Sequence, residues 1–226
     1  MPKLRKIICS TLLAILTALS FKASAKVITT PENKLTVYAG PQSVVPLEII
    51  SVTVEAVNAQ GGSLDNYPVT LSYNADDVAI MISGKTINGL VSFDVPAQTR
   101  AGLMTFTAYH KEAVSHMARI VVTAKHPLEF TLNTKQSRQV GAVDVSSNLI
   151  ADMFGNQLSD LSLAVMEWID GRGLLASQTT QLSNGRIIFT ASCPKRFSGP
   201  LHIHASLKNI SVVSEDISAL CNSERG

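Results

Sequence analysis

The sequence of 226 residues predicts an all-β protein made of two tandem antiparallel β-sandwiches, because one pattern of residues occurs in it twice. Gly61 of the first copy returns as Gly155, 94 residues later. The repeated segments and their second copies are 52–73 with 146–168, and 86–109 with 181–206. A period of about 95 residues with short, strand-like segments is typical of a duplicated β domain.

Alternation of apolar and polar residues predicts the strands of the first copy. It runs through the segments 50–56, 91–95 and 104–108. A period of two places one face of a strand in a core and the other in water. The residues predicted to point inward are Ile50, Val52, Val54, Ala56, Val91, Phe93, Val95, Met104, Phe106 and Ala108. Between these segments, Asn88-Gly89 predicts a hairpin turn, because both residues tolerate positive φ.

The second copy keeps the same phase at 187–191 and 201–205. Pro127 lies between the copies and cannot donate to a sheet ladder, which marks a joint. The parts expected from these signals are a sandwich at 26–124, a linker at 125–128, a second sandwich at 129–221 and a disordered tail at 222–226.

Residues 1–25 are typical of a cleaved signal peptide. A basic leader is followed by an apolar run of 15 residues at 7–21 and by the small residues Ala23-Ser24-Ala25. The apolar run is shorter than the ~20 residues of a membrane span, which disfavours the alternative of a retained anchor. We therefore expect an exported protein, in the periplasm, outside the cell or at its surface, with no integral membrane span in the mature chain.

The charge of the mature chain disfavours nucleic acid as a partner. Residues 1–25 carry four of the 19 Lys and Arg and none of the 17 Asp and Glu. Their removal leaves 15 basic against 17 acidic residues, a formal charge of −2. No basic excess remains to displace counterions from nucleic acid or an anionic membrane.

Two of the three cysteines, Cys193 and Cys221, remain after cleavage, since Cys9 belongs to the signal peptide. An even number of cysteines in an exported protein predicts a disulfide between them. It would close a loop of about 28 residues, worth ~3.6 kcal/mol in the chain-entropy model. The alternative is two free thiols.

The turns and strands of the repeat resemble the bacterial immunoglobulin-like domains of the invasin and intimin family. The first shared element is a turn, Asn58 to Gly62 in copy one and Asp152 to Asn156 in copy two. Two further shared elements lie at 86–93 with 181–189, and at 101–108 with 198–205. The resemblance covers about residues 35–217 and implies two tandem immunoglobulin-like antiparallel β-sandwiches. Such domains act as stacked spacers in bacterial surface proteins, sometimes with a binding tip.

Two groups of residues in the second copy are candidates for a site. Aligned on the first copy with an offset of 94, Met166 and Trp168 lie on the outer face of their strand, where they would form a partner surface. In the alternative, a bulge turns Trp168 into the core and Glu167 outward. His202 and His204 lie on one strand face, and they map to solvent-facing threonines in copy one; a metal site would need further ligands.

No catalytic motif is present: neither a Gly-x-Ser-x-Gly elbow, a His-Glu-x-x-His helix nor a phosphate-binding glycine loop occurs. We therefore expect a non-catalytic protein without cofactor or metal. It would contact a protein partner in the bacterial envelope or on a target surface, as an assembly accessory or adhesion-type module. The alternatives are a glycan- or ligand-binding β-sandwich, a periplasmic pilus-type chaperone and a small hydrolase on a β scaffold.

Overall fold

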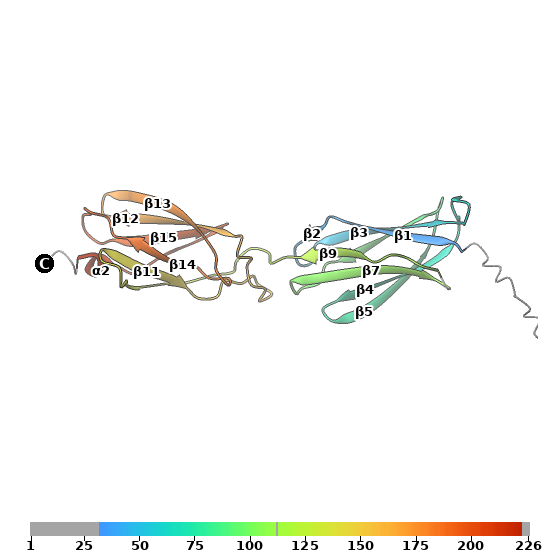
Figure 1. Cartoon of the computed structure of the whole chain (residues 1–226), viewed down its shortest axis with the longest axis horizontal. Helices are drawn as coiled ribbons and strands as arrows, with labels where there is room; N and C mark the ends of the chain where they lie inside the picture. The colour runs from blue at the N-terminus through green and yellow to red at the C-terminus, as the bar shows by residue number, and fades with distance from the viewer. Residues whose placement is uncertain (1–31, 112, 223–226) are drawn as a thin grey trace, which may run out of the picture. The chain divides into compact units, whose positions relative to one another are not determined.

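The computed structural model describes residues 32–111 and 113–222, and this part of the chain is built almost entirely of antiparallel strands (Figure 1). It confirms the predicted all-β fold of two tandem immunoglobulin-like sandwiches. The predicted signal peptide at 1–25 and most of the predicted tail at 222–226 lie outside the described residues. The predicted domain boundaries at 124 and 129 stay predictions.

The first sandwich consists of a three-stranded sheet, β1-β3-β6, and a larger sheet, β2-β9-β7-β4-β5, in which β8 pairs with β7. All neighbours are antiparallel except β2 and β9. The strands are β1 Lys34–Gly40, β2 Ser43–Val44, β3 Ile49–Val57, β4 Pro68–Ala75, β5 Val78–Lys85, β6 Leu90–Pro96, β7 Gly102–His110, β8 Ala113–Val114 and β9 Ala118–Val122.

The second sandwich consists of the sheets β10-β11-β14 and β13-β12-β15-β16, followed by the helix α2. Its elements are β10 Leu132–Gln136, β11 Ala142–Ser147, β12 Leu163–Asp170, β13 Gly173–Gln181, β14 Ile188–Ser192, β15 His202–Leu207, β16 Ile210–Val213 and α2 Ser218–Asn222.

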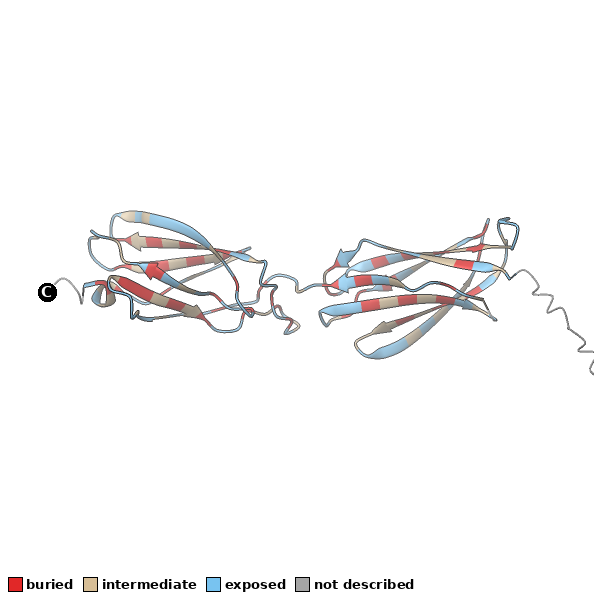
Figure 2. Cartoon of the chain, in the orientation of Figure 1, coloured by how far each residue is buried: buried red, intermediate tan, exposed pale blue. Residues whose placement is uncertain are grey.

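Each sandwich has its own apolar core, and buried residues alternate with exposed ones along the inner strands (Figure 2). In β3 every second residue from Ile50 to Ala56 is fully buried, as the alternation predicts. Val91 and Phe93 are only partly buried, because β6 lies at the edge of its sheet. Burial of a Val, Ile or Leu side chain stabilises a fold by ~1.5–3 kcal/mol, so these aliphatic cores hold the sandwiches together.

The possible partner surface at Met166 and Trp168 is wrong, and the alternative orientation, with Trp168 in the core and Glu167 outward, is confirmed. Both lie in the second core, 1% and 4% exposed, and Glu167 points outward instead. The offset between the copies changes within the preceding loop: Leu64 and Leu158 make equivalent backbone hydrogen bonds at an offset of 94. Further along, the N–H of Thr86 donates to the carbonyl oxygen of Tyr67 and the N–H of Leu182 to that of Ser162, so these equivalent acceptors lie at an offset of 95.

The second copy therefore carries one extra residue before β12, and a shift by one residue exchanges the two faces of a strand. The register between β12 and β13 also shifts between Trp168 and Ile169, which places a bulge at the end of the strand.

Candidate functional site

The strand β5 forms a free edge of the first sandwich. Among the described residues it pairs with β4 alone, and it ends the order of its sheet (Figure 1). Its sequence from Val78 to Gly84 is uncharged, and it contains no proline. Natural edge strands are commonly protected by charges, prolines or bulges, because their unpaired N–H and C=O groups can pair with another chain. These devices are missing between Val78 and Gly84.

The two faces of β5 have different surroundings. Ala79, Met81 and Ser83 lie opposite the polar outer residues of β4, and Met81 is 69% exposed. Ile80 and Ile82 face inward and pack against the edge of the core. A strand that docks beside β5 would therefore find main-chain groups along the edge and apolar side chains above and below.

The turn before β5 fixes the register of this edge. Asp76 and Asp77 have φ of 47° and 67°, as in a two-residue hairpin turn that matches the strand twist. The Asp76 carboxylate accepts hydrogen bonds from the backbone N–H groups of Arg100 at 3.0 Å and Thr99 at 3.1 Å. These two bonds lower the pKa of Asp76 below its usual value, so the carboxylate is ionised and holds the turn at neutral pH.

Close packing also fixes the position of the C-terminal end of β5, at Gly84. A Cβ added at Gly84 would lie 2.9 Å from Val91 and 3.2 Å from Phe93, both on β6 of the facing sheet. A side chain at this position would have to displace these two residues or the strand itself. With the turn at one end and Gly84 at the other, β5 is held as an edge of defined register.

The equivalent edge of the second sandwich, β13, has a different composition. It pairs with β12 alone among the described strands, and its second half reads Ser-Gln-Thr-Thr-Gln at 177–181. Ser177 occupies the place of Met81, since both face outward opposite the middle of the neighbouring strand. The second half of β13 is polar and the strand is bulged, whereas β5 is regular and apolar along its middle, which makes β5 the stronger candidate for strand addition.

The histidines predicted as a possible metal pair each have a local partner. His204 Nδ1 lies 2.9 Å from Glu167 Oε2, and His202 Nδ1 lies 3.0 Å from the carbonyl oxygen of Ser214. No group of three or more His, Cys, Asp or Glu that could hold a metal ion occurs in residues 32–111 and 113–222. The pair thus belongs to the outer hydrogen-bonding surface of the second sandwich.

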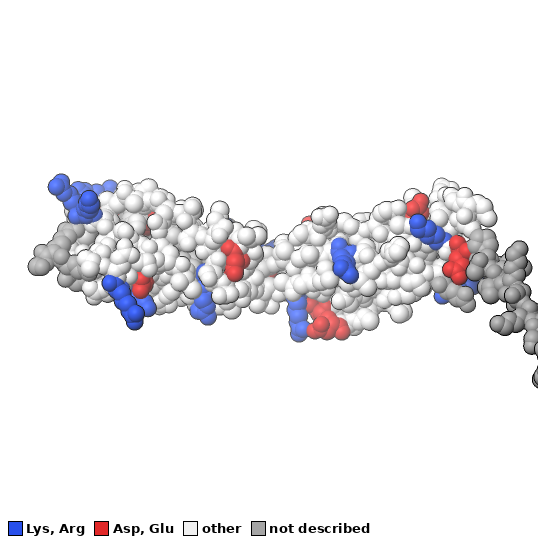
Figure 3. All heavy atoms as spheres, viewed as in Figure 1, with Lys and Arg blue, Asp and Glu red and all other residues white. Residues whose placement is uncertain are grey.

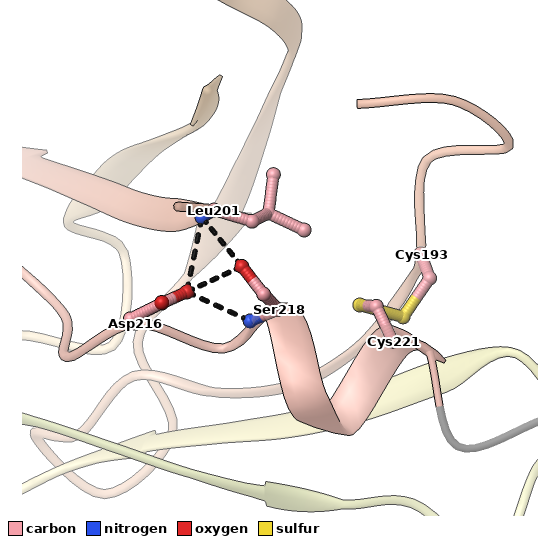
Figure 4. The surroundings of a disulfide bond; sticks show 5 residues. All are labelled: Cys193, Leu201, Asp216, Ser218 and Cys221. Carbon is pink, nitrogen blue, oxygen red and sulfur yellow. Dashed lines mark hydrogen bonds between the residues drawn. A yellow bond between two sulfur atoms is a disulfide. The ribbon is translucent and has the colours of Figure 1, made fainter. Parts of the chain in front are cut away.

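Cys193 and Cys221 are joined by a disulfide, with Cα atoms 5.6 Å apart (Figure 4). The bond ties α2 to the loop after β14. At the start of α2, Asp216 accepts hydrogen bonds from the hydroxyl and N–H groups of Ser218 and from the N–H of Leu201. The Ser218 hydroxyl is the main cause that lowers the pKa of Asp216 to about 2. This end of the second sandwich is therefore anchored covalently and by ionic hydrogen bonds.

A shallow hollow of about 250 Å³ lies over β10, β11 and β14. Its lining residues are Lys135, Asp144, Val145, Ser146, Ile188, Phe189 and Thr190. A sugar site commonly stacks an aromatic ring on the ligand, but the aromatic residue of this lining, Phe189, packs against the second core, and the single Trp of the chain, Trp168, is buried. The hollow therefore gives little support to the glycan-binding alternative.

Charge is also spread thinly over the surface. On the face shown in Figure 3, acidic and basic side chains lie in small groups of both signs, and no broad basic area is visible among the described residues. None of the described helices is long and apolar enough to cross a membrane.

No family model and no curated protein matches the chain by sequence. Among solved structures, the Escherichia coli adhesin FdeC superposes with a TM-score of 0.58 at 15% identity, over 83% of this chain and 64% of that one. The chain has the tandem immunoglobulin-like fold of that adhesin. The predicted likeness to bacterial adhesin domains is thus confirmed as a likeness of fold.

Two further structures superpose less closely on the chain. Yersinia pseudotuberculosis InvD gives a TM-score of 0.49 at 10% identity, over 83% of this chain and 68% of that one. The E. coli alpha-2-macroglobulin gives 0.40 at 15% identity, over 83% of this chain. The chain spans less than two thirds of FdeC and 14% of the alpha-2-macroglobulin.

The sequence alone does not point to the β5 edge. Apolar and polar residues do not alternate in it, because both faces carry apolar residues: Ala79 and Met81 face outward, and Ile80 and Ile82 face inward. A run of seven uncharged residues between Asp77 and Lys85 was the available signal. The sequence does not say which strands lie at a sheet edge, and only the pairing makes that run significant.

Proposed function

We propose that this chain is an exported, non-catalytic protein that works by protein–protein contact in the bacterial cell envelope or at the surface, as an assembly accessory or adhesion-type module. The observation that carries the proposal is the bare, apolar edge of β5. The likeness of fold to the adhesin FdeC and the predicted signal peptide support it.

The mechanism is strand addition at β5. An extended, uncharged segment of a partner protein pairs its main chain with the outward N–H and C=O groups of the strand. Each such hydrogen bond contributes ~0.5–1.5 kcal/mol net, so several in a row give useful affinity. Met81 on one face and Ile80 and Ile82 on the other supply apolar contacts that select an uncharged segment.

The carboxyl groups with shifted pKa values support a non-catalytic role. Asp76, Asp152, Asp170 and Asp216 all have a lowered pKa, and each accepts backbone N–H groups that fix a turn or a loop. A general acid at neutral pH requires a raised pKa instead. These carboxylates act as acceptors that hold loops in place.

The test is to capture the partner from the envelope fraction of the source cells with the tagged mature protein and with Met81→Lys. A lysine in the middle of the edge charges it without changing the core, because Met81 is exposed. The matched control is Ser177→Lys, at the same place on β13. We expect a partner that is retained by the wild type and by Ser177→Lys and is lost by at least 10-fold with Met81→Lys. Equal capture by all three proteins would refute β5 as the binding edge.

A further inference from the structure

We propose that the strand that docks on β5 is β5 of a second copy of this chain, paired antiparallel about Met81. The inference rests on the proposed binding edge and names its partner. It is carried by the self-complementarity of the nine residues Asp77 to Lys85, which read Asp-Val-Ala-Ile-Met-Ile-Ser-Gly-Lys.

A two-fold axis through Met81 matches this segment with itself. Met81 then lies opposite Met81 of the second copy, and Ile80 lies opposite Ile82. The other opposed pairs are Ala79 with Ser83 and Val78 with Gly84, and Asp77, in the turn before β5, comes next to Lys85 at the end of the paired segment. Opposed residues in an antiparallel pair share a face, so Ile80 and Ile82 of both copies meet on the inner side and extend the two cores.

The charges of Asp77 and Lys85 favour this register over registers shifted by one or two residues. In the register centred on Met81, the acidic end of each strand lies beside the basic end of the other. A slide by two residues in either direction places Asp77 and Lys85 opposite uncharged residues. A slide by one residue opposes inward residues to outward ones and loses the apolar contacts.

Asp77 and Lys85 are accessible for an ion pair between the two copies. Lys85 is exposed. The side chain of Asp77 is 85% exposed, and its present partner Arg100, at 2.6 Å, is 69% exposed. An ion pair so open to water contributes little, so Asp77 can turn toward Lys85 of the second copy at little cost.

A two-fold pairing also explains how a bare apolar edge can persist in an exported protein. Each copy uses its own β5 edge to cover that of the other, so the contact is closed and does not propagate into a filament. The sheet β2-β9-β7-β4-β5 would continue across the axis into the same sheet of the second copy. The interface is small, below the ~1,200 Å² of standard interfaces, so the dimer should dissociate at about micromolar concentrations.

The first experiment is sedimentation velocity of the mature chain from about 1 to 500 µM, a range set by the small interface. We expect a monomer–dimer equilibrium that Met81→Lys abolishes, because two lysines would face each other at the axis. Ser177→Lys should leave the dimer unchanged, and circular dichroism should show both variants folded. A chain that stays monomeric over the whole range, or a dimer that persists in Met81→Lys, would overturn the inference.

The second experiment tests the register by cysteine cross-linking under mild oxidation. Met81→Cys should form a disulfide dimer with itself. Ala79→Cys and Ser83→Cys should cross-link only when the two variants are mixed, since these residues oppose each other across the axis. Ser177→Cys is the negative control. Self-cross-linking of Ala79→Cys in preference to the mixture would contradict the pairing about Met81.

The two proposals fail in different ways. If the chain is monomeric but Met81→Lys loses an envelope partner, the proposed function stands and the self-pairing is refuted. If the chain dimerises through β5 but all variants capture the same envelope proteins, the self-pairing stands and the proposed role of this edge in partner binding is refuted.

Discussion

The two sandwiches share a fold but differ in their edge strands and in their covalent crosslinks. The first has the apolar, regular edge β5, and its described residues contain no disulfide. The second has the bulged edge β13, polar in its second half, and the bond between Cys193 and Cys221. Both sandwiches have an apolar core of buried residues, but the core of the second includes Cys221 of the disulfide. If β5 binds as proposed, the first copy provides the contact, whereas the second copy carries the crosslink.

The largest effect is expected from removal of the disulfide. Cys193→Ala with Cys221→Ala should lower the free energy of unfolding of the second sandwich by about 3.6 kcal/mol, because the unfolded chain is no longer closed into a loop. The change can be measured by urea unfolding with the fluorescence of Trp168, the single Trp, which lies in the second core. The wild type in reducing buffer is the control and should match the variant. An unchanged midpoint would show that the crosslink does not carry this stability.

A smaller effect is expected at the turn that differs between the copies. Asp152 accepts hydrogen bonds from the backbone N–H groups of Lys125, Phe154 and Asn156, each at 2.9 Å. Asp152→Ala leaves these donors without their acceptor and should cost about 2–3 kcal/mol of the free energy of unfolding, again followed by Trp168 fluorescence.

The matched change in the first sandwich is Asn58→Ala. Asn58 accepts the N–H groups of two residues, Gln60 and Gly62, and it is neutral. Its replacement should cost about 1 kcal/mol, measured by thermal unfolding followed by circular dichroism. Equal losses for Asp152→Ala and Asn58→Ala would contradict the view that the second turn is the more strongly held.

Acid should weaken the end of the second sandwich that α2 occupies. The pKa of Asp216 is lowered from 3.8 to about 2, chiefly by the Ser218 hydroxyl, so the ionised form stabilises the folded state. That contribution is complete above pH 3.8 and is lost as the pH falls through about 2. Asp216→Asn should flatten this pH dependence of the urea midpoint between pH 4 and 2. A variant with the same pH dependence as the wild type would show that ionised Asp216 does not stabilise the fold.

The smallest effect on stability is expected from Met81→Lys. The same substitution has the largest expected effect on binding. Met81→Lys should alter the free energy of unfolding of the first sandwich by less than about 0.5 kcal/mol, because Met81 is exposed and faces polar residues of β4. Thermal unfolding at low protein concentration, below the dimer range, measures it. A loss above about 1 kcal/mol would mean that Met81 supports the fold and is a poor probe of binding.

Alternation in the sequence predicted the fold and the buried faces of β3 and β7, where every second residue points inward. It failed at β12, because one residue added between Leu158 and Ser162 reverses the faces of the following strand. The extra residue lies in a loop, and a loop has no alternating pattern in which an inserted residue could be detected. The proposed binding edge was not predictable either, because an uncharged run such as that of β5 is equally suited to a central strand.

Hydrogen exchange of the β5 amides, compared at about 1 µM and about 500 µM protein, tests the central claim most directly. The account predicts that the amides of residues 78–85 which point away from β4 exchange fast in dilute solution and become protected in concentrated solution, whereas those of β13 do not change. Outward amides of β5 that exchange equally fast at both concentrations would contradict the claim that this edge binds a second copy.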